Sequence, residues 1–241
     1  MNPVVLLTRN NLELTKRCVE SVLAQDVPTD LCVFDNASSD ETVQWSRSVT
    51  KRVQAMPSNV GVSVGWNFFL RHVFDCLDAR HVLVLNNDVA LPIWFLRRLL
   101  SLDLPFVTGV SVGNMEEIAE EPPVKELMPC PDFSGFLIRR DAWQTIGPFD
   151  EALNSYCGDL DYHIRAHRKG IRLLNAGIPF FHERSSTINN ASPKDKRVLQ
   201  LQADADRQTF FEKWGVAACS PEYDAMFNEA TFAVDRDTIT A

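Results

Sequence analysis

The sequence has no long hydrophobic segment and no concentration of basic residues. No apolar run approaches the roughly 18–20 residues that a membrane-spanning helix needs. The N-terminus, Met1-Asn2-Pro3, lacks the basic and apolar regions of a signal peptide, so we expect none. The net charge is −8, and lysines and arginines do not cluster. This argues against general binding to nucleic acids and other polyanions, although a small basic groove stays compatible.

Cysteine pairs are also missing. The six cysteines are scattered without a Cys-x-x-Cys pair, and most lie in apolar segments. This pattern favours buried, reduced thiols over a disulfide framework or a zinc site, and it predicts a cytoplasmic protein. With 45% hydrophobic and 23% charged residues the chain has the balance of a globular protein. Its 241 residues suffice for one large α/β domain.

Apolar strand patterns alternate with helical patterns along the chain. Residues 4–7 and 31–34 are continuous apolar runs, as expected for strands covered on both faces. Between them, Leu14, Cys18 and Val22 recur at helical spacing. This alternation predicts an α/β protein with an open, mostly parallel twisted sheet and helices on both faces. Further strands are predicted at 81–85, 106–112, 133–138, 172–174 and 178–181, and further helices at 66–77, 140–146, 159–169 and 193–214.

Capping patterns predict where several helices begin. Asn10 with Glu13 predicts the start of the first helix, and Ser38 with Glu41 forms a capping-box pattern before the second. Pro92 predicts another helix start. Glycines precede the helix at 66, whose amino terminus we expect to offer free N–H groups to a phosphate. The acidic segment 114–131 reads as a surface loop, and the chain shows no internal repeat or linker.

Polar residues follow the first two predicted strands directly. Thr8 to Asn10 ends the first strand, and Asp35-Asn36 ends the second. Open α/β sheets bind their ligands outside the carboxyl ends of the strands. The two polar clusters therefore predict a ligand site at that edge of the sheet.

Several blocks in fixed order, spread over most of the chain, resemble the family 2 glycosyltransferases of the GT-A fold. The blocks are Thr8-Arg9-Asn10, Asp35-Asn36-Ala37-Ser38-Ser39-Asp40, Asn59-x-Gly61-x-x-x-Gly65-x-Asn67, Leu85-Asn86-Asn87-Asp88, Ser134-Gly135-Phe136-Leu137-Ile138-Arg139-Arg140, Ile146-Gly147-Pro148-Phe149-Asp150-Glu151, Tyr156-Cys157-Gly158-Asp159-Leu160-Asp161 and Lys213-Trp214-Gly215. A single block is weak evidence, whereas the ordered set is specific. The likeness is greatest to rhamnosyltransferase-like members.

The resemblance implies a single GT-A domain over residues 1–215, followed by a C-terminal extension at 216–241. Within the domain it implies a Rossmann-like nucleotide-sugar-binding half at 1–112, an acceptor and catalytic half at 132–190, and a helix at 193–215. Family members of the inverting type transfer a sugar from a nucleoside-diphosphate donor to an acceptor hydroxyl with inversion at the anomeric carbon.

The resemblance also implies which residues bind the donor. Thr8 and Asp35 would hold the nucleoside, since a carboxylate accepts hydrogen bonds from an imide N–H or from sugar hydroxyls. The other expected donor-site residues are Asn10, Asn36, Gly61, Asn67, Asn86, Asn87, Arg184 and Ser185. Of these, Arg184 and Ser185 would steady the departing diphosphate. The alternative for Asp35 is an ordinary turn or capping residue. Uracil or thymine is the favoured base, and guanine stays open.

The family's metal motif is reduced in this chain. An Asp-x-Asp variant reads Asn86-Asn87-Asp88 here, so only the last acid is retained. The resemblance implies that Asp88 and His182 bind Mn²⁺ or Mg²⁺, with diphosphate oxygens and water completing the shell. The alternatives are a polar turn at 86–88 and a structural role for His182.

The family's catalytic Glu-Asp-x-Asp block reads Gly158-Asp159-Leu160-Asp161 in this chain. Asp159 corresponds to the base that deprotonates the acceptor hydroxyl, and a helix N-cap is the alternative role. A helix amino terminus would lower the pKa of Asp159 and burial would raise it, and the sequence leaves this balance open. Trp143, Tyr156 and Asp161 are expected on the acceptor side.

We therefore predict a metal-dependent inverting glycosyltransferase that uses a UDP- or dTDP-sugar. Its acceptor would be a glycan or a soluble hydroxyl compound, including a protein or a modified DNA base. One alternative is a nucleotidyltransferase-like enzyme, although the Thr8-Arg9-Asn10-Asn11 segment is short for its phosphate loop. The other is a catalytically silent GT-A protein that binds a glycan or a partner, as the departures at Asn86 and Gly158 suggest. The oligomeric state is left open.

Overall fold

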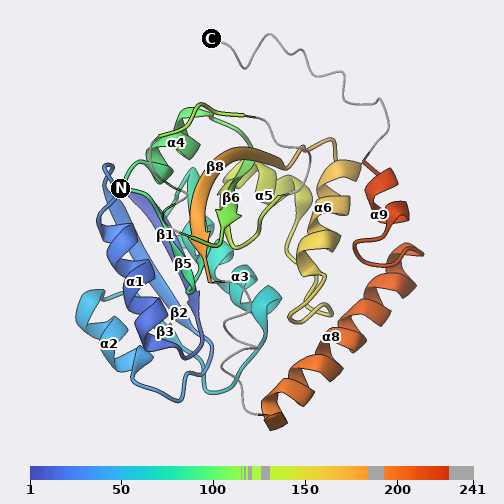
Figure 1. Cartoon of the computed structure of the whole chain (residues 1–241), viewed down its shortest axis with the longest axis horizontal. Coiled ribbons are helices and arrows are strands. Elements are labelled where there is room, and N and C mark those ends of the chain that lie inside the picture. The colour runs from blue at the N-terminus through green and yellow to red at the C-terminus, as the bar shows by residue number, and fades with distance from the viewer. Residues whose placement is uncertain (115, 117, 119–120, 126–130, 184–192, 228–241) are drawn as a thin grey trace.

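One sheet unites the two halves of the chain. The computed structural model describes all residues except 115, 117, 119–120, 126–130, 184–192 and 228–241. In this part of the chain, an eight-stranded sheet has the order β3-β2-β1-β4-β7-β6-β8-β5, and helices lie on both of its faces (Figure 1). The strands are β1 (Asn2–Thr8), β2 (Thr29–Asp35), β3 (Val53–Ala55), β4 (His81–Asn86), β5 (Val89–Ala90), β6 (Phe106–Val112), β7 (Gly135–Arg139) and β8 (Leu174–His182).

The sheet is mostly parallel. β1 pairs in parallel with β2 and β4, β2 pairs in parallel with β3, and β6 pairs in parallel with β8. β7 runs antiparallel to both β4 and β6, and β5 runs antiparallel to β8. The predicted open, mostly parallel sheet is therefore confirmed, with two opposed strands in its second half.

The helices bury both faces of the sheet. They are α1 (Leu12–Leu23), α2 (Thr42–Val49), α3 (Val62–Arg71), the π-helical turn η1 (His72–Cys76), α4 (Phe95–Ser101), α5 (Arg140–Ile146), α6 (Gly158–Arg168), α8 (Pro193–Trp214) and α9 (Pro221–Ala225). Successive residues of β1 point to opposite faces. Val5 and Leu7 pack with α3, α5 and α6, whereas Val4 and Leu6 pack with α1 and α4. This explains why the β1 segment is apolar without alternation.

The C-terminal helices pack on one another and on α6, beside the sheet. α8 runs along the outside of α6, and α9 follows it (Figure 1). A separate apolar cluster joins Leu153, Ile164 of α6, Phe210 of α8 and Tyr223 of α9. The predicted C-terminal extension thus includes a short helix that is packed on the domain, and residues 228–241 lie outside the described chain.

Two predicted helix caps are wrong. α1 follows Asn11, which has a left-handed backbone and makes no side-chain capping bond, while the Asn10 side chain accepts the Ser39 N–H at 2.7 Å. α2 begins at Thr42, whose N–H donates to Asp40 Oδ1 at 3.0 Å. Ser38 instead donates its hydroxyl to Asp35, and the same hydroxyl oxygen accepts the Asn10 N–H at 2.6 Å. In both places the side chain is used by a contact between the β1 and β2 loops, which local capping patterns do not include.

Three predicted element boundaries also differ. α3 begins at Val62 rather than at residue 66, and α4 begins at Phe95 rather than at Pro92. In place of the two predicted strands at 172–174 and 178–181 there is one strand, β8, which begins at Leu174 and continues through Gly177. The pairing of β8 with β6 shifts register between Thr108 and Val110, so the strand accommodates a local irregularity.

Candidate active site

The candidate site lies where the strand order reverses. From β1 the chain proceeds outward to β2 and β3 and then returns to β4 on the other side of β1. The loops after β1 and β4 diverge at such a switch point and leave a crevice between them. Two cavities lie at this edge, and they share Val62, Asn86, Ser155 and Tyr156 as lining residues.

The smaller cavity has a volume of about 210 Å³ and is lined by residues from the ends of β1, β2 and β4. Predicted donor-site residues in its wall are Thr8, Asn36, Gly61, Asn86, Asn87 and the metal candidate Asp88. Gly61 has a φ of +86°, and a Cβ there would overlap the Asn154 side chain. The cavity thus brings together five of the eight described residues that were predicted to bind the donor.

Asp35, the last residue of β2, does not line this cavity. Its side chain is fully buried, and its carboxylate accepts hydrogen bonds from Thr8 Oγ1 at 3.0 Å, from Ser38 Oγ at 2.5 Å and from the Ser38 N–H at 2.7 Å. Asn10 is tied to the same loop, because its N–H donates to Ser38 Oγ at 2.6 Å. Asp35 therefore fixes the β1 and β2 loops against each other.

The amino terminus of α3 is not free to bind phosphate. The Asn154 carbonyl accepts the Val62 N–H at 2.8 Å and the Ser63 N–H at 3.4 Å. Asn36 holds the preceding loop, since its side chain accepts the Val60 N–H at 2.8 Å and donates to the Gly61 carbonyl at 3.2 Å. The expected phosphate site at this helix is wrong, because a loop distant in sequence takes up its N–H groups.

Two predicted donor-site asparagines have structural partners. The buried Asn67 side chain donates to the Phe149 carbonyl at 2.9 Å and to Glu151, and it accepts the Phe149 N–H at 2.7 Å. It joins the two halves of the domain and lines neither cavity. Asn87 lines the smaller cavity and also donates to the Asn10 carbonyl and to Thr15 Oγ1, both at 3.0 Å.

Asp88 and His182 meet at the edge of the sheet. β5 pairs Val89 with His182, and the Glu183 N–H donates to the Asp88 carbonyl at 2.9 Å. This pairing sets His182 Nε2 at 3.3 Å from Asp88 Oδ1, in a position that is nearly buried. The pairing of β5 with β8 therefore assembles the predicted metal ligands from distant segments.

Asp88 and His182 could together bind a divalent metal whose remaining ligands come from outside the protein. Ser134 Oγ lies 3.0 Å from His182 Nδ1, which fixes the ring and leaves Nε2 toward Asp88. Such outer partners orient metal-binding histidines. A carboxylate oxygen and an imidazole nitrogen suit Mn²⁺ or Mg²⁺ when diphosphate oxygens supply the remaining ligands. Within the described residues no group of three or more His, Cys, Asp or Glu side chains is placed to hold a metal by itself.

The larger cavity, of about 1010 Å³, contains the predicted base. Asp159 lies in the first turn of α6, where the Leu160 N–H donates to its Oδ1 at 2.9 Å. Burial raises the pKa of Asp159, this N–H offsets part of the rise, and the Asp132 carboxylate raises the pKa further. The net effect on the pKa of Asp159 is a rise, because the effect of burial is larger than that of the helix amino terminus. The sequence had left this balance open.

The three residues predicted on the acceptor side have different surroundings. Tyr156 lines both cavities. Trp143 is buried in the core beside Phe74 and Phe149 and lines neither cavity. Asp161 is fully buried and is taken up by an ion-pair network. Of the three, only Tyr156 therefore lines a cavity.

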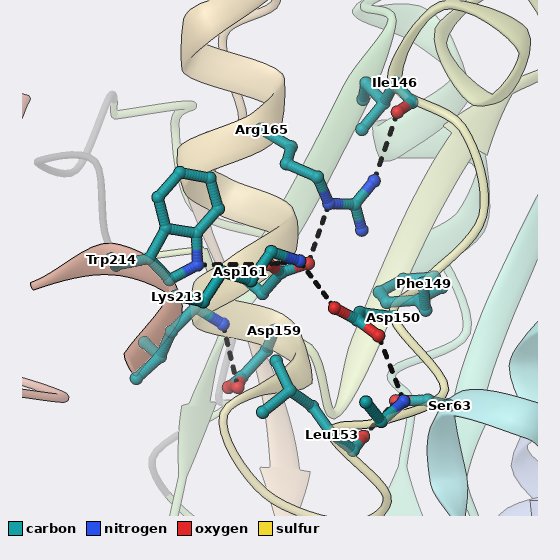
Figure 2. A network of polar contacts seen from close by, with 12 residues as sticks. Ser63, Ile146, Phe149, Asp150, Leu153, Asp159, Asp161, Arg165, Lys213 and Trp214 are labelled. Carbon is teal, nitrogen blue, oxygen red and sulfur yellow. Dashed lines mark hydrogen bonds and ion pairs between the residues drawn. The ribbon is translucent and has the colours of Figure 1, made fainter. Parts of the chain in front are cut away.

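Asp161 anchors α8 to α6 (Figure 2). It accepts Arg165 Nε at 2.7 Å and Trp214 Nε1 at 3.1 Å, and it pairs with Lys213 Nζ at 2.7 Å. The same Lys213 ammonium pairs with Asp150 at 2.5 Å. The second acid of the Asp159-Leu160-Asp161 block thus has a structural role in this chain.

Gly158 stands where the family's catalytic block has a glutamate, and the structure gives a packing reason. A Cβ at Gly158 would come within 2.8 Å of Ser63 Oγ. Ser63 is itself fixed, because its hydroxyl donates to the Leu153 carbonyl at 2.6 Å. The close approach of α6 to α3 therefore favours glycine at this position.

Some cavity residues were not singled out by the sequence patterns. Arg9 lines the smaller cavity, and it occupies the variable position of the Thr8-Arg9-Asn10 block. Asp132 and Ser134 line the larger cavity, and only Ser134 lies inside a recognised block. Arg184 and Ser185, predicted to contact the diphosphate, lie outside the described residues. In the described chain, no helix has both the length and the apolar character to span a membrane.

Solved structures share this fold at low sequence identity. A mannosyltransferase from Pyrobaculum calidifontis, in complex with GDP-Man and Mn²⁺, matches with a TM-score of 0.59 and 17% identity over 93% of this chain and 67% of its own. The glucosyl-3-phosphoglycerate synthase of Mycobacterium tuberculosis, in complex with Mg²⁺ and UDP, gives 0.58 and 17% over 91% and 81%. S. aureus TarS gives 0.58 and 17%, and the match covers 87% of this chain but only 44% of the TarS chain.

The family assignment comes from the sequence match. No curated protein sequence matches the chain significantly. The family model described as glycosyl transferase family 2 matches residues 4–150, the segment that contributes the β1, β2 and β4 loops and Asp88. The expected family is thereby confirmed: the chain belongs to glycosyl transferase family 2.

Proposed function

We propose that this protein transfers a hexosyl or deoxyhexosyl unit from a nucleoside-diphosphate sugar to an acceptor hydroxyl, with inversion at the anomeric carbon. The observation that carries the proposal is the pair of adjoining cavities at the switch point. Asp88 lines the smaller cavity and Asp159 lines the larger one, with Asn86, Ser155 and Tyr156 between them. A donor that spans both would present its anomeric carbon to an acceptor near Asp159.

The donor nucleotide would occupy the smaller cavity and its rim. Thr8, Asn36 and Asn86 offer polar groups there, and Arg9 supplies a cation for the diphosphate. Asp88 and His182 would hold a divalent metal, which when bound offsets negative charge on the diphosphate as it departs. The donor complexes of the mannosyltransferase with GDP-Man and Mn²⁺ and of TarS with UDP-GlcNAc support this donor class. We favour a UDP- or dTDP-sugar for this chain.

The chain's own residues would carry the proton transfer. The acceptor oxygen attacks the anomeric carbon, and its proton passes to the Asp159 carboxylate. The bond between the anomeric carbon and the phosphate oxygen breaks, and its electron pair leaves with the diphosphate. Burial keeps the Asp159 carboxylate more basic than an exposed aspartate, which favours this role at neutral pH.

The acceptor would enter the larger cavity, whose charged lining favours a neutral hydroxyl compound. Asp132 and Asp159 line it, and the one cationic side chain among its described lining residues, Arg207, pairs with Asp204 at 2.8 Å. Trp66, Phe133 and Tyr156 supply aromatic surface of the kind on which sugar rings pack. We therefore expect neutral sugars to be better acceptors than phosphorylated ones.

The test is a transfer assay with a panel of nucleotide sugars, Mn²⁺ and neutral or phosphorylated glycosides. Release of nucleoside diphosphate with a glycosylated product supports the proposal, and the anomeric coupling in the product's proton NMR spectrum reports inversion. Asp159→Asn should reduce the turnover number by about 10²–10⁴-fold, as expected for loss of a general base. Full turnover by this variant would contradict the assigned base.

A catalytically silent family member is the second candidate, because this chain departs from the family pattern at Asn86 and Gly158. The contact between Gly158 and Ser63 gives the second departure a packing reason that is independent of activity. Nucleotide-sugar binding without either transfer or hydrolysis would identify this candidate. Consumption of added pyrophosphate, with conversion of the nucleotide sugar to a nucleoside triphosphate and a sugar 1-phosphate, would instead indicate a nucleotidyltransferase.

A further inference from the structure

A buried carboxylate of the C-terminal helix holds the loop between the two cavities. Asp206 of α8 is 4% exposed. Its Oδ2 accepts the Ser155 N–H at 2.9 Å and the Tyr156 N–H at 2.8 Å, and its Oδ1 accepts the Asn154 N–H at 3.3 Å. Three successive backbone N–H groups therefore converge on one carboxylate. Such charge-assisted bonds are stronger than bonds between neutral groups.

The loop held in this way is part of the substrate site. Ser155 and Tyr156 line both cavities. On its other side the loop is joined to α3, because the Asn154 carbonyl accepts the Val62 and Ser63 N–H groups. The loop leads directly into α6, whose first turn carries Asp159. A change in its position would therefore reach the donor side, the acceptor side and the base.

α8 also contributes directly to the walls of the cavities. Leu199 lines the smaller cavity and Arg207 lines the larger one. Asp206 lies between these two positions in the sequence and points its carboxylate to the loop rather than to either cavity. The family model ends at residue 150, so this contribution to the site comes from outside the matched segment.

We propose that Asp206 is a positioning residue for sugar transfer, which fixes the Ser155–Tyr156 backbone so that donor and acceptor meet at Asp159. The kinetic part of this inference rests on the proposed transferase function. The structural part, that one carboxylate orders the loop, does not. A carboxylate that only adds stability would affect the folded fraction of the protein and not the chemistry of the folded enzyme.

The structural part is tested by amide hydrogen exchange in Asp206→Asn, with Glu212→Gln as the matched control. Glu212 is an exposed carboxylate on the same helix and accepts a hydrogen bond from Gln208 at 2.7 Å. Asp206→Asn should raise exchange at residues 154–156 by about tenfold or more, since three charge-assisted bonds are weakened. Glu212→Gln should leave these amides unchanged. Unchanged exchange in Asp206→Asn would overturn the inference.

The kinetic part is tested by measuring kcat/KM for transfer in Asp206→Asn and Glu212→Gln. The assay is run well below their melting temperatures, after circular dichroism has established that both variants are folded. We expect kcat/KM for transfer to fall by about ten- to a hundredfold in Asp206→Asn, the scale of a small misplacement of reacting groups. In the double variant Asp206→Asn, Tyr156→Phe, the fold-loss in kcat/KM should be smaller than the product of the losses in the two single variants. The reason is that both residues act through the same loop. Equal rates per folded molecule would show a purely structural role for Asp206. Strictly multiplicative losses would show that Asp206 does not act through the loop that carries Tyr156.

The two levels fail in distinguishable ways. If the wild-type protein transfers no sugar while exchange at residues 154–156 responds to Asp206→Asn, the proposed function fails and the ordering of the loop stands. If the wild type and Glu212→Gln are active and Asp206→Asn matches them, the positioning role fails alone. Should Asp206→Asn not fold, Asp206→Glu provides the measurement. It keeps the charge but moves the carboxylate by one methylene, so we expect higher exchange at residues 154–156 and lower transfer than in Glu212→Gln, and equality of the two variants in both measurements would overturn the inference.

Discussion

At the scale of single residues, the environment decides what each carboxylate does. Asp35, Asp161 and Asp206 are buried, and their oxygens accept hydrogen bonds from neighbouring loops or helices. Asp88 and Asp159 line the cavities. Buried carboxylates whose oxygens accept these bonds organise the backbone, whereas we propose that those at the cavity walls act on a metal or on a substrate proton.

The raised pKa of Asp159 gives a pH dependence with a defined sign. A carboxylate base acts only when it is ionised. The value of kcat/KM is therefore at its maximum above the pKa of Asp159 in the folded protein and falls as the pH drops through that pKa. Burial raises this pKa above the ordinary 3.8, so the acidic limb of kcat/KM should lie above that value. Asp132→Asn should move the limb to lower pH, because the Asp132 charge contributes to the rise. A limb that stays in place would contradict this assignment of the titrating group.

Arg9 gives a second prediction at this scale. It lines the smaller cavity beside Asp88, where a guanidinium suits phosphate oxygens. Arg9→Met should raise the donor KM by about 5- to 100-fold, corresponding to roughly 1–3 kcal/mol for a charge-assisted bond. The control is Arg47→Met, an exposed arginine on the outer helix α2. Equal donor KM values for the two variants would remove Arg9 from the donor site.

At the scale of secondary-structure elements, the site depends on how α8 is anchored. Lys213 near the end of α8 pairs with Asp161 at 2.7 Å and with Asp150 at 2.5 Å (Figure 2). The Asp161 side chain is fully buried, whereas the Lys213 side chain is 34% exposed. Lys213 therefore supplies charge to a carboxylate that water does not reach.

Lys213→Met should destabilise the fold more than Lys16→Met. Lys16 has a similarly exposed side chain and a contact of 2.7 Å, but its partner Glu13 is 83% exposed. We expect a loss of about 1–3 kcal/mol for Lys213→Met, toward the lower end because solvent screens part of the attraction. For Lys16→Met the loss should stay below about 0.5 kcal/mol. Denaturant unfolding of the two variants measures the difference, and equal losses would contradict it.

The same ion pairs set a pH window for the anchoring of α8. Burial alone would raise the pKa of Asp150, but its bond to Lys213 lowers it below the ordinary value. The stability that this ion pair adds to the fold is fully present above the ordinary pKa of 3.8. It is lost as the pH falls through the depressed pKa of Asp150. Burial alone would lower the pKa of Lys213, but Asp150 and Asp161 raise it above the ordinary value of 10.5. The stability that the ion pairs add is therefore lost at high pH only above 10.5.

At the scale of the whole molecule, the site draws on segments that are far apart in the sequence. The β1, β2 and β4 loops form one side, β8 brings His182 to Asp88, and the loop before α6 closes the gap between the cavities. A ligand that contacts all of them binds only the folded chain. It should therefore raise the melting temperature by mass action.

A UDP- or dTDP-sugar with Mn²⁺ should stabilise the protein measurably. At a ligand concentration of about 100 times Kd the gain is about 2.7 kcal/mol. For a chain of this size that corresponds to roughly 5–10 °C in a thermal shift assay. Asp88→Asn should remove the Mn²⁺-dependent part of the shift, and EDTA should do the same for the wild type. A shift that survives both treatments would exclude Asp88 as a metal ligand.

Much of the fold could be predicted from the sequence because its signals are local. Apolar runs located the strands β1, β2, β4 and β6, and the ordered polar blocks at their carboxyl ends indicated the family and the edge that carries the site. The helix caps at Asn10 and Ser38 were predicted wrongly. In both cases a contact between the β1 and β2 loops uses the side chain in place of the local capping bond.

The roles of the polar side chains were decided by the tertiary structure. Asn67, Trp143 and Asp161 have residue types that suit a substrate site, but partners distant in sequence place them in the core or in a structural network. Conversely, Arg9 and Asp132 became candidates only once the cavities were known.

The sequence by itself determined the sheet, the family and the strand ends at which the cavities lie, because hydrophobic periodicity and short motifs act between near neighbours. The tertiary structure alone decided which acids face the cavities and that α8, through Asp206, holds the loop between them. Burial and the choice of hydrogen-bond partner depend on segments that meet only when the chain has folded.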